Sequence, residues 1–138
     1  MKRFLCLILL AMNLSHCASV DGSIYTVAKA QEGGFFRRGQ SFQCANWVAS
    51  VARKAGKSLP KNHGMARSWL RWGKPVSFAS KQPGDVIVLW RGSPRSKSGH
   101  ILIYAGNGQA IHRSTYRSPI ERVDVNTYRG RVLGVRRG

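Results

Sequence analysis

Cys44, His100 and His112 are of the residue types that thiol-based hydrolysis requires, and they lie far apart in the sequence. Cys44 is followed by apolar residues at helical spacing, so we expect it to begin a helix. The positive end of a helix dipole favours a thiolate, and the N–H groups of the first turn can donate to an oxyanion. His100 and His112 are candidates for the general base and for the group that orients it. This set indicates cleavage of an acyl bond by a nucleophilic thiol.

The cysteine count leaves two interpretations of Cys44. Cys6 lies in a candidate signal peptide, and Cys17 would be removed with that peptide or become lipidated. Cys44 would then be the single cysteine of an exported domain, without a partner for an internal disulfide. It could be a buried small hydrophobe or a nucleophile, and the count alone does not decide between them.

Hydrophobic patterning predicts the elements that position these residues. One apolar helical stripe contains Cys44, Trp47, Val48, Val51, Ala52 and Ala55, and a second short helix is expected over 65–73. Strands are expected over 86–90, 100–105, 109–112, 120–125 and 132–135, as an antiparallel meander. We therefore predict an α+β domain in which N-terminal helices pack on an antiparallel sheet of about five strands.

A tight turn predicts that the two histidines meet. Gly106-Asn107-Gly108 suits a hairpin, so His100 and His112 can lie on paired neighbouring strands at the same end. His112 could then hydrogen-bond one nitrogen of His100 while the other nitrogen faces Cys44. His63 lies in a polar loop and is expected to be an ordinary histidine. The sequence shows no metal-ligand spacing, so we expect no metal and no other cofactor.

The N-terminus is typical of an export signal. Met1-Lys2-Arg3 precedes an apolar run and small residues, so residues 1–19 are predicted to be a signal peptide. The protein is then expected in the periplasm, at the cell surface or secreted, with a lipid anchor at Cys17 as the less favoured option. Residues 20–40 are predicted to be a polar arm with little regular structure, and 41–138 to be the catalytic domain.

The charge balance is strongly basic. The 138 residues contain 23 Lys and Arg against five Asp and Glu, a formal charge of +18. In an exported protein such a field favours anionic envelope polymers, although a solvated basic surface is the simpler alternative. We expect no specific nucleic-acid partner, because the export signal and the lack of an interleaved aromatic–basic motif argue against one. The length fits one domain, expected to be monomeric.

Four ordered segments resemble the NlpC-like cysteine peptidases, which share the papain-like superfamily with the CHAP amidases. They are Phe42-Gln43-Cys44-Ala45-Asn46-Trp47-Val48, Pro83-Gly84-Asp85-Val86-Ile87-Val88, Gly99-His100-Ile101-Leu102-Ile103-Tyr104-Ala105-Gly106 and Ile111-His112. Residues 65–73 resemble a segment of a phage- and cell-wall-associated branch. The resemblance covers about residues 40–137.

This resemblance implies a papain-like fold of the NlpC type and peptidoglycan hydrolysis by a Cys44, His100 and His112 triad. Candidates beside the nucleophile or in its oxyanion site are Gln43 and Ala45, and candidates for the substrate groove are Asn46, Trp69 and Trp90. The residues flanking Cys44 depart from the family's usual Asp and Ser-Gly, which leaves the cleaved bond open.

Several functions are compatible with this sequence. The favoured bond joins D-glutamate to the diamino acid of the stem peptide, and N-acetylmuramoyl-L-alanine amidase activity is the close alternative. A basic protein that binds wall polymer or nucleic acid, with a purely structural thiol, is the alternative from another class. The sequence does not separate a remodelling enzyme from an exported toxin or lysin.

Overall fold

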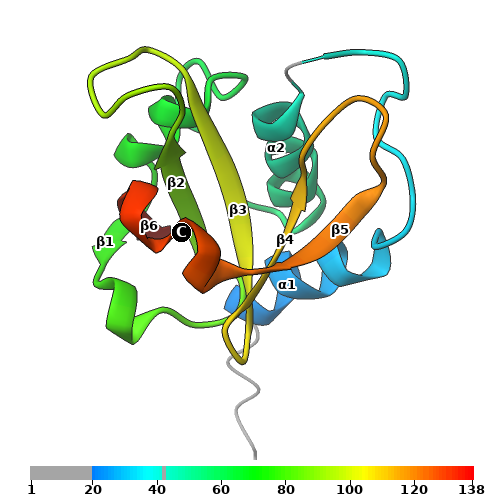
Figure 1. Cartoon of the computed structure of the whole chain (residues 1–138). Coiled ribbons are helices and arrows are strands. Elements are labelled where there is room, and N and C mark those ends of the chain that lie inside the picture. Colours follow the sequence, from blue (N-terminus) through cyan, green and yellow to red (C-terminus); the bar gives the residue numbers. More distant parts are fainter. Residues whose placement is uncertain (1–19, 42) are drawn as a thin grey trace, which may run out of the picture.

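The computed structural model describes residues 20–41 and 43–138 (Figure 1). The predicted signal peptide, with Cys6 and Cys17, lies outside these residues. The helices are α1 (Val20–Ala30), α2 (Cys44–Lys54) and the 3-10 helices η1 (Ala66–Arg71), η2 (Phe78–Ser80) and η3 (Val125–Arg131). The strands are β1 (Lys74–Val76), β2 (Val86–Trp90), β3 (Gly99–Gly106), β4 (Gln109–Arg113), β5 (Ile120–Asp124) and β6 (Val132–Arg137). Within this part of the chain, every helix is too short or too polar to cross a bilayer.

The strands form one antiparallel sheet in the order β1-β6-β2-β3-β4-β5. The predicted helix-on-sheet α+β architecture is confirmed, with six strands where about five were expected. Strands β2 to β5 form the expected meander, but β6 returns to pair with β2 on its other side. The sequence missed β1 because it has three residues and contains Pro75, which strands tolerate only at an edge.

Two apolar layers hold the sheet, one on each face. Helices α1 and α2 pack on the face that carries Val86, Val88, Ile101 and Ile103, and the opposite cluster contains Ile87 and Leu89 with neighbours from β6 and η3. Because both faces are covered, the central strands are continuously apolar instead of alternating. This buried centre gives β3 and β4 a fixed register, which positions the histidines.

Helix α2 begins at Cys44, as the apolar stripe predicts. Trp47, Val48 and Val51 are buried on its inner face. The helix ends before Gly56, which has a φ of +74° that favours glycine. The thiol therefore lies at the N-terminus of a helix that is anchored on the sheet.

The expectation of little regular structure in residues 20–40 is wrong for 20–30, whereas residues 31–40 form only turns and bends. Helix α1 occupies Val20–Ala30, and Ile24 and Ala28, one helical turn apart, are buried in the core. The chain then pairs with β5, where the N–H of Gly33 donates to the carbonyl of Ile120. Polar residues on the outer face of α1 obscured this short apolar stripe in the sequence.

The segment 65–73 forms a 3-10 helix, η1, where a short helix was expected. Trp69 and Trp72 are buried and lie edge to face with ring centroids 5.1 Å apart. Their indole N–H groups donate to the carbonyls of His63 and Ser58. These bonds fasten the loop that forms one wall of the depression around Cys44.

Candidate active site

Cys44 opens onto a surface depression of about 150 Å³. The thiol is partly buried, at the first residue of α2. The depression is lined by Cys44, Gly64, Met65, Ala66, Arg91, Lys97, Ser98 and Gly99. Since Gly99 immediately precedes His100, the start of β3 borders the cysteine, as the convergence of thiol and imidazole requires.

The predicted pairing of His100 and His112 is confirmed. Nε2 of His100 lies 2.7 Å from Nδ1 of His112, and the two rings meet edge to face with centroids 4.9 Å apart. The side chains come from β3 and β4, which are joined by the predicted hairpin. Both rings are buried, with exposed fractions of 5% and 2%. Each ring is therefore held in one orientation by the packed sheet.

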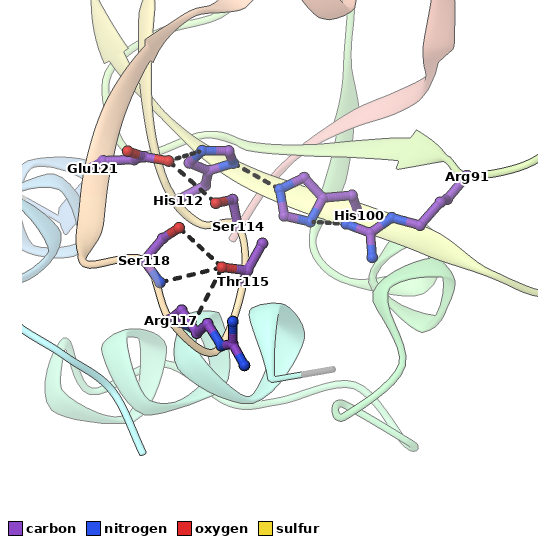
Figure 2. Close-up of polar contacts among 8 residues, drawn as sticks. All are labelled: Arg91, His100, His112, Ser114, Thr115, Arg117, Ser118 and Glu121. Carbon is purple, nitrogen blue, oxygen red and sulfur yellow. Dashed lines mark hydrogen bonds and ion pairs between the residues drawn. The ribbon is translucent and has the colours of Figure 1, made fainter. Parts of the chain in front are cut away.

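The partners of the rings determine where their protons lie. Nη2 of Arg91 lies 3.3 Å from Nδ1 of His100 (Figure 2). A guanidinium only donates, so Nδ1 accepts and neutral His100 carries its proton on Nε2. That N–H donates to Nδ1 of His112, which leaves the His112 proton on Nε2, 3.5 Å from Oε1 of Glu121. The result is a donor chain that runs from Arg91 through His100 to His112, whose buried Nε2 points toward Glu121 without meeting hydrogen-bond geometry.

Both histidines are kept neutral by their surroundings. Burial, the nearby His112 and the cations Arg91 and Arg131 lower the pKa of His100 from 6.5 to about 3. Burial also lowers the pKa of His112, against the opposing effect of Glu121. A neutral imidazole, whose Nδ1 carries no proton, is the form that can accept a proton from a thiol once Arg91 no longer donates to that nitrogen.

The expected low pKa of Cys44 is not found. Burial raises the pKa of this thiol above its ordinary value, because the charged form loses hydration. Arg91, the backbone N–H groups of Ala45 and Cys44, and Arg113 act in the opposite direction without overcoming burial. Position at a helix N-terminus alone therefore does not produce a resting thiolate. The site pairs a neutral thiol with a neutral imidazole.

Arg113 links the active-site strand to the segment before α2. It is 2% exposed, and its guanidinium donates to the carbonyls of Phe36, Arg37 and Gln40. These bonds tie the backbone on the N-terminal side of Cys44 to β4. They fix the segment that leads into α2 against the strand that carries His112.

The remaining sequence candidates differ in their placement. The side-chain carbonyl of Gln43 accepts a bond from the amide of Asn46 at 2.7 Å, so these two side chains engage each other. Ala45 is buried, and its backbone N–H is the part that affects the thiol. Trp69 is fully buried in the core and does not line a groove. Trp90 lies half-buried at the end of β2, outside the lining of the Cys44 depression.

Two site residues were missed from the sequence. Glu121 lies directly opposite His112 in the β4–β5 register, so an alignment of the two strands would have indicated it. Arg91 could not be singled out among 23 cationic side chains. It reaches His100 because the loop after β2 folds back, with the N–H of Arg91 donating to the carbonyl of Ser98. Across residues 20–41 and 43–138, no cluster of three His, Cys, Asp or Glu side chains could hold a metal ion.

Comparison with known proteins identifies the family of this chain. The sequence profile of the NlpC/P60 family matches residues 31–137. The chain belongs to the NlpC/P60 family. This NlpC/P60 chain is 30% identical over 106 residues to a probable endopeptidase of Mycobacterium tuberculosis, covering 77% of this chain and 24% of that protein. It is 26% identical over 101 residues to the gamma-D-glutamyl-L-lysine dipeptidyl-peptidase of Bacillus cereus, covering 72% and 29%.

Solved NlpC/P60 structures share the fold. An NlpC/P60 protein from Bacillus cereus superposes with a TM-score of 0.71 at 22% identity, covering 85% of this chain and 39% of that one. NlpC2 from Trichomonas vaginalis gives a TM-score of 0.65 at 25% identity, covering 85% and 46%. The chain spans about a quarter of the length of the curated relatives described above. NlpC/P60 domains are cysteine peptidases, and the relatives of this chain are named as an endopeptidase and a dipeptidyl-peptidase.

Proposed function

We propose that this chain is an exported cysteine hydrolase that cleaves the amide bond between D-glutamate and the diamino acid in peptidoglycan stem peptides. The observation that carries the proposal is the 2.7 Å bond between His100 and His112, because His100 directly follows Gly99 and contacts Arg91, which both line the depression that contains Cys44. The printed activity of the Bacillus cereus relative supports the choice of bond. The amidase alternative has no such support from the named relatives.

Cys44 and His100 supply the chemistry. Because both groups are neutral at rest, Sγ attacks the amide carbon as Nδ1 of His100 accepts the thiol proton. The carbonyl π electrons move to oxygen, and the N–H groups at the start of α2 donate to that oxyanion. As the tetrahedral intermediate collapses, its C–N bond breaks and Nδ1–H of His100 protonates the departing amine.

Water completes the reaction. A water molecule attacks the thioester carbon as its proton passes to Nδ1 of His100, and the C–S bond breaks to release the acid. The thiolate that leaves takes this proton back, which restores neutral Cys44 and His100. No oxidant or reductant enters either half of the cycle.

His112 and Glu121 stabilise the charge that appears on His100. When Nδ1 is protonated, Nε2–H of the imidazolium donates to Nδ1 of His112. His112 in turn directs its own N–H toward the carboxylate of Glu121. The negative charge at the end of this chain favours the imidazolium without taking its proton.

The charge and the N-terminal sequence also bear on where the protein acts. We infer that residues 1–19 direct export and that the formal charge of +18 retains the monomeric enzyme near anionic envelope polymers. N-terminal sequencing of the protein recovered from its host's envelope or medium tests the first point. A mature terminus upstream of residue 15, or protein confined to the cytoplasm, would contradict it.

Mass spectrometry of digested muropeptides tests the activity. Wild-type protein should release fragments with a new free amine on the diamino acid, while Cys44→Ala and His100→Ala should release none. Fragments that have lost the whole peptide from muramic acid would identify an amidase instead. Unchanged muropeptides with all three proteins would refute the hydrolase and leave a cationic binding protein.

A further inference from the structure

Arg91 lines two surface depressions. It lines the depression of Cys44, and it also lines a second one of about 230 Å³ together with Ser41, Ser114, Thr115 and Tyr116. Neither lining contains a carboxylate. A ligand that extends from the thiol into the second depression would therefore pass a cation and meet no anionic side chain.

The guanidinium of Arg91 has no carboxylate partner among the described residues. Its side-chain contact is with Nδ1 of His100, which uses one of five N–H donors. The acids whose side chains are described are engaged elsewhere: Asp85 with Arg137, Glu32 with Arg122, Glu121 with His112, and Asp124 with the backbone of Asn126. Arg91 is thus a partly buried cation with donors available for an anion from outside the chain.

The proposed substrate carries a suitable anion. A glutamyl residue linked through its γ-carboxyl group keeps an α-carboxylate, which is separated from the scissile carbonyl by three carbon atoms. When that carbonyl lies at Sγ of Cys44, the α-carboxylate is close enough to reach the cations that line the same depression, Arg91 and Lys97. Of these two, Arg91 is the one that also contacts His100. Guanidinium and carboxylate form paired, charge-assisted hydrogen bonds.

We propose that Arg91 binds the free α-carboxylate of the D-glutamyl residue and so selects stem peptides in which this group is not amidated. The inference rests on the proposed function, since it assumes cleavage at this residue. Nδ1 of His100 has one lone pair, which serves either the guanidinium or the thiol proton. A carboxylate that binds Arg91 and draws its guanidinium away from Nδ1 of His100 therefore also leaves this nitrogen able to accept the thiol proton.

Two synthetic stem peptides that differ only at this group test the proposal. One has the free α-carboxylate of D-glutamate and the other has the carboxamide. Wild-type protein should cleave the free form with a kcat/KM higher by about tenfold or more, the range of a charge-assisted hydrogen bond. In Arg91→Gln the ratio should fall to within about twofold, because a neutral amide gains little from the charge.

Arg95→Gln is the matched control. Arg95 is an exposed cation of the same loop and lines neither depression, so its variant should keep the wild-type ratio. A ratio of two substrates also cancels any effect that Arg91 has on the thiol itself. If Arg91→Gln does not fold, Arg91→Lys provides the test. An ammonium cannot form two parallel hydrogen bonds to a carboxylate as a guanidinium does, so this variant should lower the kcat/KM ratio of the two peptides several-fold.

The outcomes separate the two proposals. Equal cleavage of both peptides by the wild type, or a wild-type ratio in Arg91→Gln or Arg91→Lys, overturns the role of Arg91 and leaves the hydrolase intact. Cleavage of neither peptide by any variant overturns the proposed function and this inference with it. Tighter binding of the free-carboxylate peptide to Cys44→Ala, which cannot turn it over, would support the role of Arg91 without relying on catalysis.

Discussion

Nε2 of His100 lies 2.7 Å from Nδ1 of His112, and the donor-only guanidinium of Arg91 at the other nitrogen of His100 fixes the direction of that bond. Neutral His100 must hold its proton on Nε2, so its Nδ1 carries the lone pair. This is the tautomer in which His100 can act as a base toward Cys44 while His112 supports the resulting charge. The geometry of three side chains therefore selects the reactive form of the base before substrate binds.

Glu121 should influence the rate modestly. Glu121→Gln keeps an oxygen for the N–H of His112 and for the hydroxyl of Ser114 but removes the charge. Because the carboxylate is 43% exposed and 3.5 Å from His112, we expect kcat to fall by less than about tenfold. Asp124→Asn, an exposed change on the same strand, should leave kcat unchanged. Equal losses in the two variants would contradict a specific role for Glu121.

Alkylation of Cys44 should report a raised pKa. Since burial outweighs the cations near the thiol, the rate with iodoacetamide should be low near neutral pH and rise with an apparent pKa above the ordinary value of 9.0. Removing the cation in Arg91→Gln should move the apparent pKa further upward, whereas Arg95→Gln should not. Full reactivity at pH 6–7 would show that the thiol is ionised at rest, contrary to this account.

Acid should destabilise the protein through His100. Its pKa is 6.5 in an ordinary setting and about 3 in the fold, so above pH 6.5 the ring is neutral in both states and contributes nothing. Below pH 6.5 the unfolded chain binds a proton that the folded protein excludes until about pH 3. The free energy of unfolding should then fall by at most about 1.4 kcal/mol per pH unit from this group.

Urea unfolding between pH 7 and pH 4 measures this effect. The wild type should lose stability more steeply than His100→Gln, which has no titrating ring at this position. Parallel curves for the two proteins would show that folding does not lower the pKa of His100.

Trp69 should matter for stability and not for substrate binding. Trp69→Phe keeps most of the buried ring but leaves the carbonyl of His63 without its indole donor, at a cost of about 1–3 kcal/mol. Chemical denaturation should detect this loss while KM for the stem peptide stays unchanged. A large rise in KM without loss of stability would restore Trp69 as a groove residue.

Short-range sequence patterns correctly predicted one helix, one buried strand and one hairpin. The stripe of α2, the apolar run of β2 and the hairpin between β3 and β4 were sufficient to place Cys44 at a helix start and to bring His100 to His112. Helix α1 was missed because its buried stripe is short, and the pairing of β6 with β2 is a long-range contact with no local signal.

The electrostatics could not be predicted in the same way. The pKa of Cys44 depends on the competition between burial and nearby cations, and burial is a property of the packed fold. Arg91 reaches His100 through the conformation of a glycine- and serine-rich loop, held in part by bonds from Arg67 to three of its carbonyls. No spacing in the sequence distinguishes this arginine from its neighbour Arg95.

The most direct test of the mechanism is detection of the acyl-enzyme. Protein mixed with a stem peptide and quenched in acid should carry the acyl fragment, L-alanyl-D-glutamate for a peptide that begins with L-alanine, as a thioester that peptide mapping assigns to Cys44. His100→Ala should form neither this adduct nor product. Undiminished cleavage of the stem peptide by Cys44→Ala would contradict the account, because no other described residue could then replace the thiol that it requires.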